Sequence, residues 1–114
     1  MPWLPTRDDR PMSEHTQWLY RIVPARPGMA QDPTPDEAAL AGAHFDYLVA
    51  LQERGILILA GRTQEPEPFG IAIFEAPDET AARAIAEADP AIAGGLFLAT
   101  LHPYRVAVAR DGLV

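Results

Sequence analysis

The segment GIAIFEAPDETAARAIAEADP, residues 70–90, decides the fold because it passes from one type of secondary structure directly into another. The β-branched and aromatic residues of 69–76 predict a strand. Asp78 then stands where a helix N-cap is expected, at the start of a helix over 77–90. The inward face of that helix has helical spacing and consists of Ala82, Ile85, Ala86 and Asp89.

The residues before this segment predict a hairpin and a long helix. ILILAGRT at 56–63 is a second apolar strand, separated from 69–76 only by a short link, and the two favour a β-hairpin. The clearest helix begins at Thr34, which forms a predicted capping box with Glu37, and it ends at Gly55. Its apolar stripe is completed by a histidine and consists of Leu40, His44, Tyr47, Leu48 and Leu51.

Two further strands complete the pattern. QWLYRIV at 17–23 is the first, and 96–109 is the last. Pro103 cannot donate a ladder hydrogen bond, so the last strand is expected at a sheet edge. The order β-α-β-β-α-β predicts an α+β, ferredoxin-like sandwich, a four-stranded antiparallel sheet with two helices on one face.

The domain organisation and assembly follow from the apolar pattern. Residues 1–15 are polar and Pro-rich and predict a flexible N-terminal tail, followed by one domain over 16–110. The strands are apolar almost without alternation, whereas a sheet covered on one face alternates. Because two helices cover one face only, we expect a homodimer through the open sheet face, a dimeric α/β barrel-like assembly.

Composition excludes several classes of function. The 114 residues carry a formal net charge of −7, and all nine basic residues are Arg without a basic cluster, so no nucleic-acid partner is expected. There is no Cys, which excludes thiolate nucleophiles and fits a cytoplasmic protein. No apolar run approaches the ~20 residues of a membrane span. Ser13 is the single serine and Asn is absent, which argues against a serine hydrolase.

Three pieces of the chain, in order, resemble the YCII-related family of small dimeric ferredoxin-like proteins. They are HFDYLVALQERGILILAG, GIAIFEAPDETAARAIAEADP and LATLHPYRV, within residues 17–108. The resemblance implies the dimeric α+β fold and a His/Asp active site, and some relatives remove HCl from chlorinated aromatic diols. The positions that match that pair are His44 and Asp89.

The residues themselves also favour a pairing of His44 with Asp89. Both lie on the sheet-facing stripes of adjacent predicted helices. A carboxylate on one ring nitrogen orients an imidazole, and the other nitrogen can then take or give a proton. A structural role is the alternative, in which Asp89 satisfies backbone donors at the Pro90 turn and His44 is a core histidine bound to a carbonyl.

Other polar residues carry weaker signals. His102 is expected to be exposed or at an interface, and no ligand spacing supports a metal site with His44 and Asp89. No cofactor is expected. Three arginines in or beside strands are candidates for binding an anionic substrate: Arg21, Arg62 and Arg105.

The sequence favours a small enzyme that uses His44 and Asp89 as a general acid/base pair on a small organic molecule, of lyase, isomerase or dehydrochlorinase type. The alternative is a non-catalytic dimeric ligand-binding or accessory module.

Overall fold

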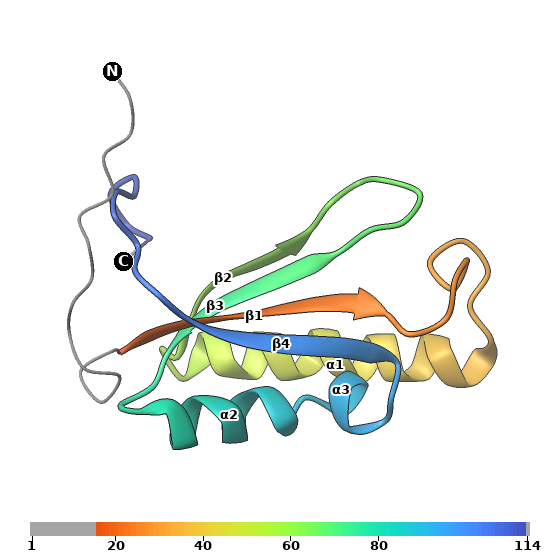
Figure 1. Cartoon of the computed structure of the whole chain (residues 1–114), viewed down its shortest axis with the longest axis horizontal. Helices are drawn as coiled ribbons and strands as arrows, with labels where there is room; N and C mark the ends of the chain where they lie inside the picture. Colours follow the sequence, from red (N-terminus) through yellow and green to blue (C-terminus); the bar gives the residue numbers. More distant parts are fainter. Residues whose placement is uncertain (1–15, 114) are drawn as a thin grey trace.

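Four strands form one antiparallel sheet in the computed structural model, which describes residues 16–113. The strands are β1 (Gln17–Pro24), β2 (Leu57–Arg62), β3 (Gly70–Glu75) and β4 (Phe97–Tyr104). Their spatial order is β2-β3-β1-β4, so β4 lies at an edge, as Pro103 requires (Figure 1). The predicted tail over 1–15, with His15, lies outside the described residues.

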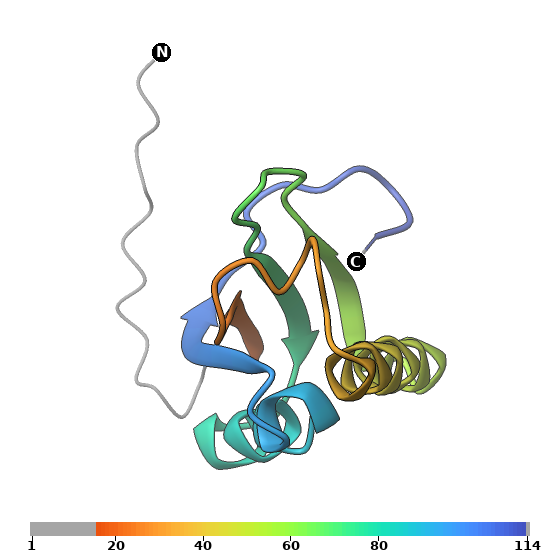
Figure 2. The same cartoon turned by 90° about the vertical axis from the view of Figure 1, so that its right-hand side faces the viewer.

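Three helices lie on one side of this sheet, where two were expected (Figures 1 and 2). They are α1 (Pro35–Glu53), α2 (Glu79–Glu87) and α3 (Pro90–Ala93). The prediction that one helix runs from 77 to 90 was wrong, because Asp89 begins a new helix as its N-cap. Pro90 supplies a fixed φ at the first position of α3, where a missing N–H costs nothing.

The entry to α1 is fixed by side-chain hydrogen bonds. Thr34 and Glu37 form the predicted capping box. Arg26 donates to Glu37 from both Nε (2.9 Å) and Nη2 (2.7 Å). The hydrogen bond from Arg26, with the backbone N–H of Thr34, lowers the pKa of Glu37 to about 2. At the other end Gly55 has the expected left-handed φ of 73°.

The loop between β1 and α1 is held by contacts with α3 and with the β2–β3 connection. Met29 is buried against Ala91 and Leu96. The Gln31 side-chain amide donates to the carbonyl of Pro66 in the β2–β3 connection. The long loop therefore packs on α3 and reaches the hairpin.

The main core lies between the sheet and α2. It contains alternate residues of the two central strands, which project toward the helices, and small residues of α2: Trp18, Tyr20, Ile22, Ala72, Phe74, Ala82 and Ala86. Phe74 lies beside Tyr20, with ring centroids 5.7 Å apart. Alanines on α2 allow that helix to approach the bulky residues of β1 closely.

The last strand is shorter than predicted, since it ends at Tyr104 and not at 109. Tyr104 pairs with Gln17, the first residue of β1, so β1 offers no partner beyond it in the part of the chain that the structure describes. The Gln17 side chain then accepts a hydrogen bond from the backbone N–H of Val106 at 2.8 Å. Pairing partners, not local propensity, set this boundary.

The sheet face opposite the helices exposes apolar side chains. Leu98 is 61% exposed, Tyr104 39% and Leu59 37%. No helix among residues 16–113 covers this face (Figure 2). None of the helices in the same part of the chain is long and apolar enough to cross a membrane.

Candidate active site

Asp89 is a fully buried carboxylate, with 0% exposure, at the junction of α2 and α3. Its Oδ1 accepts a hydrogen bond from the backbone N–H of Ala91 at 3.0 Å. Its Oδ2 accepts from the Tyr20 hydroxyl at 2.9 Å and lies 2.6 Å from His44 Nδ1. The local cap and the His44 pair therefore coexist, one on each oxygen.

His44 lies in the third turn of α1, and its side chain reaches Asp89 at the junction of α2 and α3. The ring is held from a second side by Phe97, which meets it edge-on at 5.2 Å between centroids and 78° between planes. An ionised carboxylate only accepts hydrogen bonds, so Nδ1 carries the proton toward Asp89. Nε2 has no hydrogen-bond partner within residues 16–113. The side chain keeps 15% exposure, and the ring lines a pocket.

Tyr20 fixes the same carboxylate from the sheet. Burial, followed by the negative charge of Asp89, raises the pKa of Tyr20 well above its usual range. The phenol therefore keeps its proton and acts as a donor to Asp89. Tyr47, one turn after His44, donates to the carbonyl of Ile85 at 2.6 Å and ties α1 to α2. Burial also raises the pKa of Tyr47.

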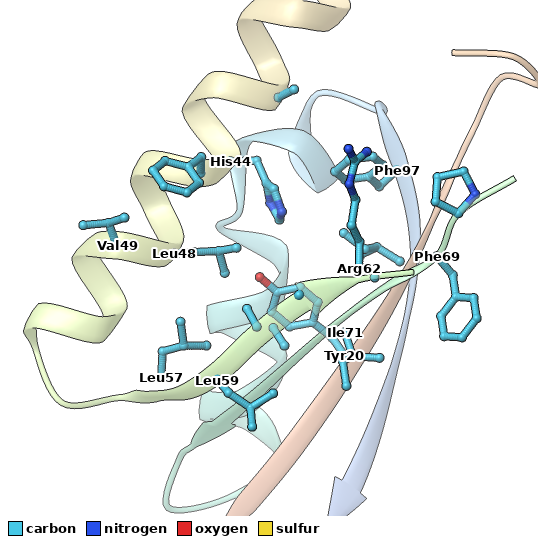
Figure 3. Close-up of a pocket in the computed structure, with 18 of the residues that line it drawn as sticks. Tyr20, His44, Leu48, Val49, Leu57, Leu59, Arg62, Phe69, Ile71 and Phe97 are labelled. Carbon is cyan, nitrogen blue, oxygen red and sulfur yellow. The ribbon is translucent and has the colours of Figure 1, made fainter. Parts of the chain in front are cut away.

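A cavity of about 760 Å³ lies beside His44, between α1 and the strands (Figure 3). Its walls are mostly apolar and include Leu48 and Val49 of α1, Leu57 of β2 and Ile22 of β1. Only Leu51 of the predicted stripe of α1 is fully buried, and two members of the stripe, His44 and Leu48, line this cavity. Such an apolar, concave site with few polar groups is typical of small-molecule binding.

Of the other candidate residues, only Arg62 joins this site. His102 pairs in register with Leu19, so it projects to the face opposite Tyr20, and its Nε2 lies 2.9 Å from Thr100 Oγ1. Arg21 lies on that same face and stacks over Phe69 at 4.5 Å. Arg105 follows β4 and is exposed. Arg62, in contrast, lines the cavity. No group of three or more metal-ligating side chains occurs within the described chain.

Sequence reasoning missed two residues of the site, Tyr20 and Phe97. Tyr20 packs in the core, and its hydroxyl also donates a hydrogen bond to the Asp89 carboxylate. A signal was present, because Tyr20 lies between Trp18 and Ile22 on the inward face of β1, and a buried hydroxyl needs a partner. Phe97 carried no comparable signal.

Solved structures of other proteins have a fold similar to that of this chain. Nine chains of solved structures match it. One is 5-chloro-2-hydroxyhydroquinone dehydrochlorinase (TftG) from Burkholderia phenoliruptrix AC1100, in complex with 2,5-dihydroxybenzoquinone. The match has a TM-score of 0.56 and 23% identity, and it covers 76% of this chain and 93% of that chain. The likeness supports the α+β, ferredoxin-like fold. The comparison with curated proteins gave no match.

The sequence model of one family spans most of the chain. It is the model of the YCII-related domain, which matches residues 7–101 and so includes β1, β2, β3, the first part of β4, the three helices and the His44–Asp89 pair. The expected resemblance is confirmed by this match, and the chain belongs to the YCII-related domain family.

Proposed function

We propose that the protein is a small enzyme in which His44 and Asp89 perform general acid/base chemistry on a small organic molecule. One observation carries this proposal. A buried carboxylate holds Nδ1 of His44 at 2.6 Å, while the ring lines an apolar cavity. This arrangement leaves Nε2 as the nitrogen available to a ligand, in a mostly apolar site.

The supporting contacts assign a role to each group. Tyr20 and the Ala91 N–H hold both oxygens of Asp89, so the carboxylate cannot turn away from the ring. Asp89 selects the tautomer with the proton on Nδ1, and Nε2 is then the acceptor. When Nε2 takes a proton, the nearby carboxylate stabilises the imidazolium that forms.

Dehydrochlorination is the reaction to test first, because TftG is a dehydrochlorinase with the same fold. For a chlorinated hydroxyquinol, one hydroxyl proton moves by way of the base to the ring carbon that bears chlorine. Chloride then leaves with the C–Cl bonding electrons while a second hydroxyl proton is released. The products are HCl and a hydroxybenzoquinone, so no external oxidant or reductant is required. Lyase and isomerase reactions of other small molecules need the same pair.

The test is chloride release and quinone absorbance with 5-chloro-2-hydroxyhydroquinone, measured against the uncatalysed reaction. His44→Gln is expected to lower kcat by about 10²–10⁴-fold. Asp46→Asn, on the exposed side of the same helix, is the control and should retain activity. If His44→Gln turns over as fast as the control, the proposal is wrong. Ligand binding without turnover in the parent protein would support the alternative of a non-catalytic binding module.

We also propose that the protein is a homodimer through the open sheet face and acts in the cytoplasm as one domain over 16–110. The support is the exposed apolar side chains on the sheet face opposite the helices, Leu98 and Tyr104 of β4. Light scattering should give twice the mass of the chain. Leu98→Arg should give the monomer mass, since it would bury two like charges at a symmetric contact. A parent protein that is monomeric at micromolar concentration contradicts the dimer.

A further inference from the structure

Arg62 places a permanent positive charge in the wall of the His44 cavity. It is the last residue of β2 and pairs in register with Gly70 across the hairpin. Figure 3 shows the guanidinium extending toward the end of the cavity that holds His44 and Phe97. Within residues 16–113 no carboxylate or carbonyl forms a hydrogen bond or ion pair with Arg62.

The surroundings of Arg62 differ from those of the arginines that serve the fold. Arg26 is paired with Glu37 and Arg83 with Glu79. The cavity lining contains no Asp or Glu among the residues that the structure describes. Asp89 is fully buried behind His44 and is occupied by three donors. The wall therefore offers a ligand one cation and no competing anion.

The three groups at this end of the cavity match one class of ligand. A guanidinium binds an ionised carboxylate or phenolate oxygen with directed hydrogen bonds. Phe97 and the apolar walls of the cavity suit an aromatic ring. His44 lines the same cavity, so its Nε2 is available to a second polar group of such a ligand. Because the protein carries a net charge of −7, an anion needs such a local cation to offset the repulsive field.

We infer that Arg62 is the positioning residue of this site and that it selects small aromatic substrates carrying an ionised oxygen. This inference rests on the proposed function, since it assigns the substrate class of the same cavity. Arg62 holds the anionic oxygen at one side of the ring, and His44 moves a proton at another. Loss of Arg62 should therefore weaken binding of the anion much more than binding of a neutral ring of equal shape.

Calorimetric titration with gentisate, a dihydroxylated benzoate, and gentisamide, its neutral amide, tests this selectivity. The full chain should bind gentisate more tightly than gentisamide. Arg62→Gln should weaken gentisate binding by about tenfold or more, since a charged hydrogen bond is lost, and should change gentisamide binding less than about twofold. The gentisate affinity of Arg62→Lys should fall between those of the parent protein and Arg62→Gln. Arg54→Gln, an exposed arginine at the end of α1 that does not line the cavity, is the matched control and should change neither affinity.

The outcomes separate this inference from the proposed function. Equal loss for both probes, no loss for either, or no binding of gentisate by the parent protein overturns the role of Arg62. Gentisate binding to His44→Gln shows whether the cavity still selects anions when the base is removed. If anion selectivity is present but no variant of His44 alters turnover, the catalytic proposal fails and the assignment of Arg62 stands.

Discussion

Replacing Asp89 with Asn should switch the tautomer of His44 while leaving the fold intact. In the parent protein, Oδ1 accepts from the Ala91 N–H, while Oδ2 accepts from the Tyr20 hydroxyl and faces His44 Nδ1. The Asn side chain must keep its oxygen toward Ala91, so its NH₂ group replaces Oδ2. An NH₂ group donates and cannot accept. Nδ1 must then become an acceptor, and the ring proton moves to Nε2.

The cost to stability should be moderate, because one buried donor loses its acceptor. The NH₂ group has two hydrogens for His44 Nδ1 and for the Tyr20 oxygen, and the Tyr20 O–H, which donates to Oδ2 in the parent, then lacks that acceptor. Two charge-assisted hydrogen bonds become neutral ones, a loss of about 1 kcal/mol each. The substitution also removes a buried charge whose desolvation is costly. We expect a net change in unfolding free energy within about 2 kcal/mol, and a melting temperature within ~15 °C of the parent.

Activity should fall far more than stability. A protonated Nε2 cannot accept a proton from substrate, so kcat should drop by about 10²–10⁴-fold. Long-range ¹H–¹⁵N correlation of the histidine rings reads the tautomer directly. The parent should show the proton of His44 on Nδ1, and Asp89→Asn should show it on Nε2. The same tautomer in both proteins would refute this reasoning, as would full activity in a variant with the switched ring.

Three further predictions concern the fold. The pKa of Tyr20 is raised by burial, so the unfolded chain releases this proton near pH 10.0 and the folded one retains it; stability should fall as pH rises above that value, less steeply in Tyr20→Phe, as measured by urea unfolding. The Arg26 hydrogen bond lowers the pKa of Glu37 from 4.5 to about 2, so the stability that the Glu37 carboxylate contributes should be lost as pH falls from 4.5 to about 2. A Glu37→Gln variant that loses as much stability as the parent over this pH range contradicts this. A Cβ at Gly94 would lie 2.8 Å from a Leu40 methyl and 2.9 Å from the Pro90 carbonyl oxygen, so Gly94→Ala should cost about 1–3 kcal/mol of stability. Gly42→Ala, with nothing within 4 Å in the middle of α1, is its control and should stabilise by about 0.5–1 kcal/mol; equal melting temperatures for the two glycine variants would contradict the packing at Gly94.

The order of the four strands and the starts of α1 and α2 could be predicted from the sequence because local rules decide them. The Thr34–Glu37 box, the Asp78 cap and the Gly55 stop each depend on residues within one turn. Pro103 placed β4 at an edge because a missing N–H is a property of one residue. The end of β4 was not predictable in this way, since it depends on where β1 begins.

The candidate site, too, was predictable from the sequence only in part. Helical spacing and the family pattern brought His44 and Asp89 forward as a pair, and the contact of 2.6 Å is present in the structure. Spacing did not show that Asp89 begins α3, because a proline after a carboxylate can end one helix or start another. The Tyr20 hydrogen bond, the Phe97 ring contact and the Arg62 position all join residues far apart in the chain. Only the packing of α1 against α3 and β2 brings them to one cavity, because burial and hydrogen-bond partners across the fold are not encoded in local spacing.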